Sequence, residues 1–203
     1  MKLKKVILVI ILIAIILAGI IAVAFLGKKN KTSNNNNTGK IKVTASNFAS
    51  YDFLRAIIGD NDNIELTFLL GPGKDAHSYD PTAQDLITIQ NSDLFIYIGG
   101  EMEKWADRVL LTLDTSSTKV ICVADDIKTI EEQEIDGAEP EDEEDEEEGA
   151  FDEHIWTSPD NAITMVNTLE KSMEEIDSSN SSKYKQNAEN YIVKIKNVDK
   201  QIQ

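Results

Sequence analysis

Residues 64–98 read IELTFLLGPGKDAHSYDPTAQDLITIQNSDLFIYI, and they give the clearest indication of the fold. The first part of this stretch, residues 64–70, is an apolar run that predicts a strand. A Gly-Pro-Gly turn follows, and Asp80-Pro81 then supplies an N-cap and a proline at the first position of a helix. Residues 94–98 (LFIYI) form a second apolar run. A strand, a helix and another strand in close succession predict a parallel pair of strands joined by a right-handed crossover.

The same alternation continues on both sides of this stretch. Upstream, residues 41–45 predict a strand and residues 48–58 predict an amphipathic helix. Downstream, residues 101–113 predict a helix and residues 119–123 another strand. The strands are predominantly apolar, which is typical of a sheet that helices cover on both faces. We therefore predict an α/β fold for residues 41–178, with one parallel-sheet lobe and helices on both of its faces.

Two further helices follow along the chain. Ser158-Pro159 combines an N-cap with proline at the first helical position, ahead of an apolar stripe. Residues 181–203 keep a helical periodicity to the last residue, without a Gly or Pro that would end the helix. We expect this helix to protrude from the lobe with part of its apolar stripe uncovered, namely Tyr191, Ile195, Val198 and Ile202.

The N-terminal segment differs from the rest in composition. Residues 6–26 carry no charge, and at about 1.5 Å per residue a helix of this length crosses the ~30 Å apolar core of a membrane. We predict a transmembrane anchor or signal helix in residues 1–27 and a flexible linker in residues 28–40. The positive-inside rule places the N-terminus in the cytoplasm, because the terminal amine adds to the lysines before the segment. The expected location is the cell membrane, anchored at the N-terminus with the body on the extracytoplasmic side. A long, cleaved signal peptide is the alternative.

The acidity of the chain is concentrated in one run. The formal net charge is −16, and 15 of the 36 acidic residues fall in residues 131–153, which contain no Lys or Arg. Such a run predicts a disordered, self-repelling loop inserted in the lobe. No basic stripe follows the first 40 residues, which excludes nucleic-acid binding through phosphate contacts. The carboxylates of the acidic run are candidates for weak, secondary cation binding, in particular Glu143, Glu144, Asp145, Glu146, Glu147 and Glu148.

The chain has only two histidines, and both lie in loops that precede a helix. His77 follows the strand at residues 64–70, and His154 lies after the last predicted strand. In parallel sheets ligands bind outside the carboxyl ends of the strands, which is where these loops are expected. Neutral imidazole is the commonest metal-ligand side chain, so the two histidines are candidate metal ligands. Their spacing matches no local metal motif, and ordinary surface histidines remain the alternative.

Three segments resemble one family. Residues 71–105 (GPGKDAHSYDPTAQDLITIQNSDLFIYIGGEMEKW) are similar to the N-terminal lobe of the metal-binding receptors, or substrate-binding proteins, of zinc and manganese ABC importers. In that family a histidine in a G-x-x-x-H-x-Y-x-P-type loop binds the metal. Residues 151–169 (FDEHIWTSPDNAITMVNTL) look like its second motif, D-P-H-x-W, with Glu153 in place of the proline. Residues 43–60 (VTASNFASYDFLRAIIGD) fit the opening strand and helix.

The resemblance implies a function and an incomplete site. His77 and His154 are by this likeness metal ligands of an extracytoplasmic receptor that delivers zinc to the membrane permease of an ABC importer. Receptors of this family have two lobes joined by a long helix, and the second lobe supplies two more ligands. Residues 181–203 look like the start of that helix, with the C-terminal lobe absent. The chain is then either a fragment of a longer protein or a receptor reduced to half of a site.

Other readings stay open. The length of the acidic run favours zinc over manganese within this family, but the run lacks the histidines of zinc-type loops. Neither a G-x-S-x-G motif nor a plausible catalytic triad is present, so we expect no enzyme. The alternative function is that of a membrane-anchored acidic adaptor, or a cation-buffering protein with no specific metal site.

Overall fold

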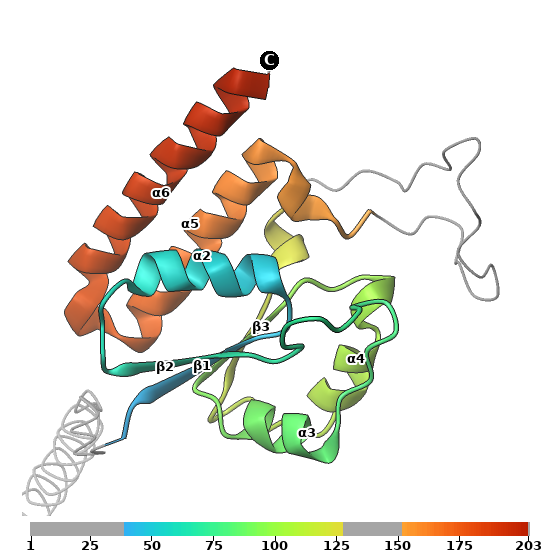
Figure 1. Ribbon diagram of the computed structural model, residues 1–203. Coiled ribbons are helices and arrows are strands. Elements are labelled where there is room, and N and C mark those ends of the chain that lie inside the picture. The colour runs from blue at the N-terminus through green and yellow to red at the C-terminus, as the bar shows by residue number, and fades with distance from the viewer. Residues whose placement is uncertain (1–38, 128–151, 203) are drawn as a thin grey trace, which may run out of the picture. The chain divides into compact units, whose positions relative to one another are not determined.

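The computed structural model describes residues 39–127 and 152–202 (Figure 1). The predicted transmembrane or signal helix, most of the linker and nearly all of the acidic run lie outside these residues. Within the two described ranges no helix is both long and apolar enough to cross a membrane.

Four strands form one sheet in which every pair is parallel. The strands are β1 (Ile41–Ala45), β2 (Ile64–Phe68), β3 (Leu94–Tyr97) and β4 (Lys119–Cys122). Their order across the sheet is β2-β1-β3-β4, and each connection between neighbouring strands is a crossover. All four strands were predicted from the sequence, although the last three end one or two residues earlier than expected. The prediction of a parallel α/β lobe is confirmed.

Helices cover both faces of this sheet, and each face has its own apolar cluster (Figure 1). Side chains of β3 show the division. Leu94 and Ile96 lie in the cluster shared with α2 (Phe48–Ile58) and α5 (Pro159–Ile176), whereas Phe95 lies in the cluster shared with α3 (Ala83–Gln90) and α4 (Trp105–Leu110). Successive residues of a strand point to opposite faces, so one apolar strand serves both clusters. One more helix, α6 (Ser181–Ile202), follows α5 along the chain.

Two helices differ from their predicted form. The N-cap of α3 is Thr82 rather than Asp80, because Thr82 and Asp85 form a reciprocal capping box two residues further on. The predicted helix over residues 101–113 is divided into a 3₁₀ helix, η1 (Glu101–Glu103), and the short α4. The carboxylate of Glu103 accepts hydrogen bonds from the backbone N–H groups of Ile98 and Gly99, which ties this turn back to the end of β3. Three more 3₁₀ turns are η2 (Val123–Asp126), η3 (Ile155–Thr157) and η4 (Ser178–Asn180).

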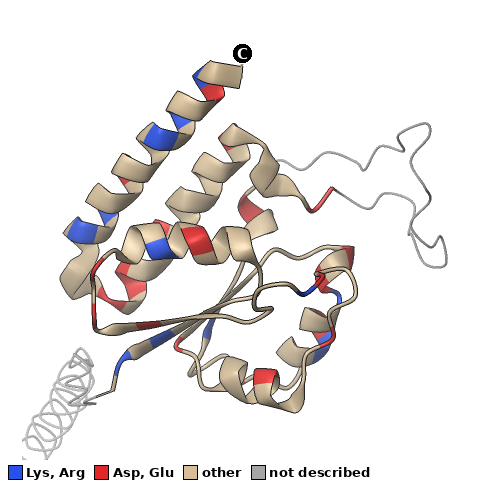
Figure 2. Ribbon diagram, viewed as in Figure 1, with Lys and Arg blue, Asp and Glu red and all other residues tan. Residues whose placement is uncertain are grey.

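The final helix, α6, is only partly uncovered. Its first half packs on α2 and α5, with Tyr184 and Ala188 buried and Tyr191 and Ile195 half-buried against the same core. Its last turns extend past α5, and Val198 and Ile202 are 54% and 75% exposed (Figure 1). The prediction that the apolar stripe is uncovered is therefore wrong for Tyr191 and Ile195 and confirmed for Val198 and Ile202. Figure 2 shows lysine positions along α6 in blue. All of them are exposed, namely Lys183, Lys185, Lys194, Lys196 and Lys200.

Candidate metal centre

His77 lies in the loop between β2 and α3, at the carboxyl edge of the sheet. The Asp75 side chain shapes this turn, since its two oxygens accept hydrogen bonds from the His77 backbone N–H (3.2 Å) and the Ser78 hydroxyl (3.2 Å). Tyr79 holds the loop to the lobe, because its ring packs edge-on against Trp105 with the centroids 5.6 Å apart. The His77 side chain itself stays exposed to solvent.

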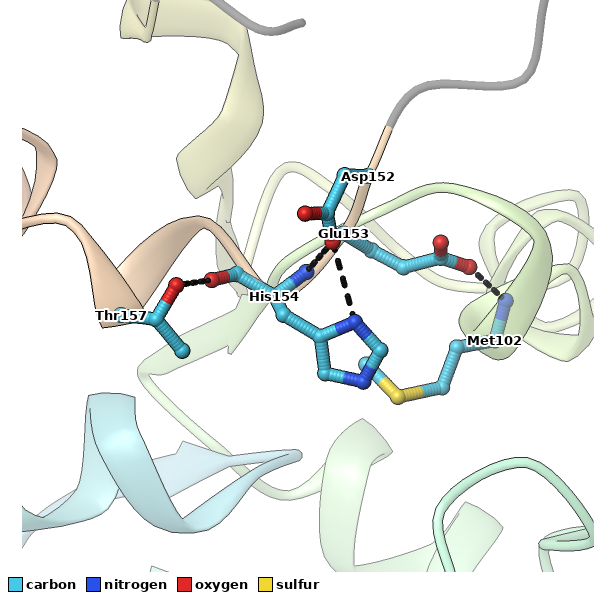
Figure 3. A network of polar contacts seen from close by, with 5 residues as sticks. All are labelled: Met102, Asp152, Glu153, His154 and Thr157. Atoms are coloured by element: carbon cyan, nitrogen blue, oxygen red, sulfur yellow. Dashed lines mark hydrogen bonds and ion pairs between the residues drawn. The ribbon is translucent and has the colours of Figure 1, made fainter. Parts of the chain in front are cut away.

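His154 lies in the loop that leads into η3 and α5, and polar contacts hold both its backbone and its ring (Figure 3). One carboxylate oxygen of Asp152, Oδ1, accepts a hydrogen bond from the His154 backbone N–H (2.9 Å) and lies 3.0 Å from ring atom Nδ1. On the other side, the His154 carbonyl oxygen accepts hydrogen bonds from the Thr157 backbone N–H (3.0 Å) and hydroxyl (2.7 Å). Trp156 packs beside the ring at 5.4 Å between centroids.

The two loops bring the two histidines together. The ring centroids of His77 and His154 are 5.5 Å apart, with the ring planes tilted by 37°. They come from loops separated by 77 positions in the sequence, and the parallel sheet places both loops at the same edge. Two imidazoles this close can each turn a nitrogen towards one ion, which is a necessary condition for shared ligation. Ligation by these residues stays a prediction.

The remaining ligands of a complete site are not found in this part of the chain. Among the residues that the structure describes, no group of three or more His, Cys, Asp or Glu side chains is arranged to hold a metal ion. Zinc in proteins normally takes four ligands, so two imidazoles supply half of a shell. Glu143, Glu144, Asp145, Glu146, Glu147 and Glu148 lie outside the described residues.

Sequence reasoning missed the role of Glu153. Its side chain is buried, with 4% exposed, and its Oε1 accepts a hydrogen bond from the Met102 backbone N–H (2.7 Å; Figure 3). Met102 belongs to η1, which begins at Glu101, shortly after β3 ends at Tyr97, so this bond joins the His154 loop to the carboxyl edge of the sheet. The one signal in the sequence was the departure from the family motif, where proline stands at this position.

A second buried carboxylate, Glu103, lies next to Glu153. Burial raises the pKa of the Glu103 carboxyl, and hydrogen bonds from Ser46, Gly99 and Ile98 oppose that rise. The charge of Glu153 raises the pKa of Glu103 further. Gly99, which donates one of these bonds, has a φ of +95° and packs closely on Cys122, since an added Cβ would lie 2.9 Å from the Cys122 sulfur.

Comparison with known proteins supports the resemblance. The family model described as zinc-uptake complex component A, periplasmic (ZnuA), matches residues 43–203. The zinc-binding lipoprotein AdcA of Streptococcus pneumoniae (strain R6) is 29% identical over 188 residues, which are 93% of this chain and 36% of the relative. The chain thus spans about a third of the length of the AdcA relatives that it matches.

Solved structures show the same fold. The Zn(II)-bound AdcA from Streptococcus pneumoniae superposes with a TM-score of 0.65 at 30% identity, over 80% of this chain and 32% of that one. A Mn-bound periplasmic metal binding protein from Candidatus Liberibacter asiaticus superposes with a TM-score of 0.64 at 31% identity, over 78% of this chain and 54% of that one. The likeness is to one lobe of these larger proteins, as the sequence motifs predicted.

Proposed function

Because the chain belongs to the family of zinc-uptake complex component A, periplasmic, we propose that its lobe binds a zinc ion outside the cytoplasm for delivery to the permease of an ABC importer. The family description and the names of the relatives are those of metal-binding and uptake proteins, not of enzymes. The prediction that the chain is not an enzyme is confirmed.

The observation that carries this proposal is the pairing of His77 and His154. Their rings lie 5.5 Å apart on loops at the carboxyl edge of a parallel sheet, where ligands of such folds bind. Neutral imidazole suits zinc, and loops on a rigid sheet are a usual place for binding residues. We assign both histidines as metal ligands contributed by this lobe.

Zinc is the first candidate among divalent metals. One matched relative is named a zinc-binding lipoprotein and its structure holds Zn(II), while a second matched structure holds manganese and another relative is named an iron-binding protein. Imidazole nitrogen favours zinc over manganese, which prefers oxygen ligands. Manganese is therefore the less favoured cargo.

We further propose the division of the chain into working parts. Residues 41–178 form the N-terminal receptor lobe, with the acidic run at residues 131–153 inserted in it, and residues 181–203 form the start of a helix that leads to a second lobe. Residues 1–27 serve as the membrane anchor or signal and residues 28–40 as a linker. A second lobe supplies the other two ligands, so this chain by itself binds zinc far more weakly than a four-ligand site does.

A zinc titration of the full chain, purified in detergent, tests the assignment. At pH 7.5 the single changes His77→Ala and His154→Ala should each remove most of the zinc affinity, because a site with two protein ligands cannot lose one and remain a chelate. The matched control replaces the six carboxylates at residues 143–148 by amides, and it should leave the histidine-dependent affinity in place. Suppose instead that zinc affinity persists when both histidines are changed and is lost when the six carboxylates are replaced. That result would favour the acidic, cation-buffering alternative.

The pH dependence provides a second check on the same titration. A protonated imidazole cannot coordinate a metal ion. The ordinary pKa of an imidazole is about 6.5, whereas that of a carboxylate is about 4. Binding through the histidines should therefore fade between pH 7.5 and pH 5.5, while binding through carboxylates should persist at pH 5.5. Full zinc affinity at pH 5.5 would contradict the assignment.

A further inference from the structure

The two residues that precede His154 use their side chains differently: Asp152 contacts the backbone N–H and the Nδ1 of His154, whereas Glu153 accepts a hydrogen bond from the Met102 backbone N–H. We propose that Asp152 and Glu153 are positioning residues for His154, where Asp152 fixes the ring and its tautomer and Glu153 fixes the backbone. The inference rests on the proposed function, which makes His154 a metal ligand. The two residues orient His154 before a metal ion binds.

Asp152 decides which ring nitrogen of His154 is available. An ionised carboxylate can only accept hydrogen bonds, so its contact with Nδ1 at 3.0 Å requires a hydrogen on that nitrogen. In the neutral ring the lone pair is then on Nε2, which is left as the nitrogen that can bind a metal. Metal-ligating histidines commonly donate their other ring N–H to a carboxylate, which sets the tautomer and orients the ring.

One oxygen of Asp152 also holds the backbone of the same residue. Oδ1 accepts from the His154 N–H at 2.9 Å and lies near Nδ1 at 3.0 Å, so the main chain and the ring are held at a common point (Figure 3). The two side chains are 36% and 42% exposed, and pairs this open to solvent add little to the free energy of folding. The consequence of the contact is therefore ring orientation rather than stability.

Glu153 acts on the backbone of the loop instead. Successive side chains point apart here, and Glu153 turns into the lobe, where its Oε1 accepts the 2.7 Å hydrogen bond from Met102 N–H. A proline at this position, as in the family motif, restrains the backbone through its own ring. In this chain a hydrogen bond to a residue 51 positions away supplies the restraint that proline would supply locally.

Matched pairs of variants separate these roles from a general loss of structure. Asp152→Ala removes both contacts to His154, whereas Asp152→Asn keeps an amide oxygen that can accept from the backbone N–H and from Nδ1–H together. Glu153→Ala removes the acceptor for Met102, and Glu153→Gln retains it. Asp62→Ala serves as the control for the loss of one negative charge, since Asp62 is exposed in the turn before β2, at the opposite edge of the sheet.

The first measurement needs no metal. Long-range ¹H–¹⁵N NMR spectra of the full chain report the tautomer of each imidazole, and the His77→Ala spectrum assigns the two. We expect His154 in the metal-free protein to carry its hydrogen on Nδ1 in the wild type, in Asp152→Asn and in Asp62→Ala. Asp152→Ala should give a mixture of tautomers, with the melting temperature unchanged.

The second measurement is zinc affinity at pH 7.5. Asp152→Ala should weaken it by roughly 10–100-fold, as loss of a carboxylate behind a histidine ligand typically does, and Asp152→Asn by less. Glu153→Ala should weaken zinc binding as well, and Glu153→Gln should restore it. Asp62→Ala should bind zinc as the wild type does.

Two results would overturn the inference, and they differ in what they say about the proposed function. If zinc binding needs His154 but Asp152→Ala changes neither tautomer nor affinity, the positioning role is wrong while the metal site stands. If His154 holds the Nδ1 tautomer but zinc binding does not depend on His154, the proposed function itself is wrong, and the role in metal binding fails with it.

Discussion

At the scale of single residues, Asp177 joins the end of α5 to the start of α6. Its carboxylate accepts hydrogen bonds from the hydroxyl of Tyr184 (2.6 Å) and the side-chain amides of Asn180 (2.8 Å) and Asn61 (3.3 Å). Tyr184 is fully buried, and its hydroxyl also accepts a hydrogen bond from Asn61 at 2.7 Å. All three donors reach the same carboxylate oxygen, Oδ2, and hydrogen bonds to a charged acceptor are stronger than those to a neutral one, so the charged form of Asp177 stabilises this junction.

The pH dependence of Asp177→Asn tests this junction. Burial alone would raise the pKa of the Asp177 carboxyl, but hydrogen bonds from Ser179, Tyr184 and Asn180 outweigh burial and lower the pKa below its ordinary value. A lowered pKa in the folded state means that the stabilisation is present above the pKa of the unfolded chain and is lost as pH falls through the folded value. We expect the variant to lose about 1–3 kcal/mol of unfolding free energy at pH 7. Denaturant unfolding should show this difference shrinking below about pH 4, and a difference that stays constant down to pH 2 would contradict the interpretation.

At the scale of secondary structure, α6 has two halves with different surroundings. The first half is held by buried Ala188 and by two polar contacts, in which the Asn187 amide donates to the Ile57 carbonyl (2.9 Å) and the Tyr191 hydroxyl donates to Asp52 (2.9 Å). Burial and the neighbouring Asp52 raise the pKa of Tyr191 to about 12, so this donor keeps its hydrogen at any physiological pH. Val198, ten residues after Ala188, is exposed.

A glutamate substitution should therefore change the free energy of unfolding much more in the first half of α6 than in its last turns. Ala188→Glu puts an unpaired charge into the core and should cost more than about 3 kcal/mol or prevent folding, whereas Val198→Glu should change the unfolding free energy by less than about 0.5 kcal/mol. Thermal or denaturant unfolding of the full chain measures both. A large loss of stability in Val198→Glu would show that the last turns of α6 are covered in the full chain.

At the scale of the whole molecule, the acidic run is an insertion between two well-packed positions of one lobe. Ile127 and Ile155 lie on either side of it and are both buried in the cluster formed with α5. The run itself lies outside the described residues, so its predicted disorder remains a prediction. Its eleven acids between residues 134 and 149 repel one another whether or not they contact the lobe.

Deletion of residues 134–149 tests whether the lobe folds without the run. We expect the melting temperature at low salt to be unchanged or higher, because the deletion removes like charges and leaves the buried residues in place. The difference should diminish as salt screens the repulsion. A clear fall in melting temperature would show that the run packs against the lobe.

Features of this protein that depend on neighbours along the chain could be predicted from the amino-acid sequence. Apolar runs and helical spacing predicted the four strands and the order of the helices, because burial on a sheet or helix face imposes a period of two or about 3.6 residues. The motifs around His77 and His154 likewise predicted the family and placed both residues in loops at the carboxyl edge. Cap positions were less certain, since Thr82 and Asp80 are both good N-cap residues and only the capping box with Asp85 decides between them.

Contacts between residues far apart in the sequence became visible only in the folded lobe. His77 and His154 lie in loops that follow β2 and β4, the two outer strands of the order β2-β1-β3-β4, and yet their ring centroids are 5.5 Å apart. A period along the chain carries no information about this meeting. In the same way the Glu153 side chain reaches Met102 across 51 positions, and Asp177 reaches Asn61 across 116. These contacts form because the helices pack on one sheet and so bring distant parts of the chain together. The sequence around each residue contains no pattern that identifies its distant partner.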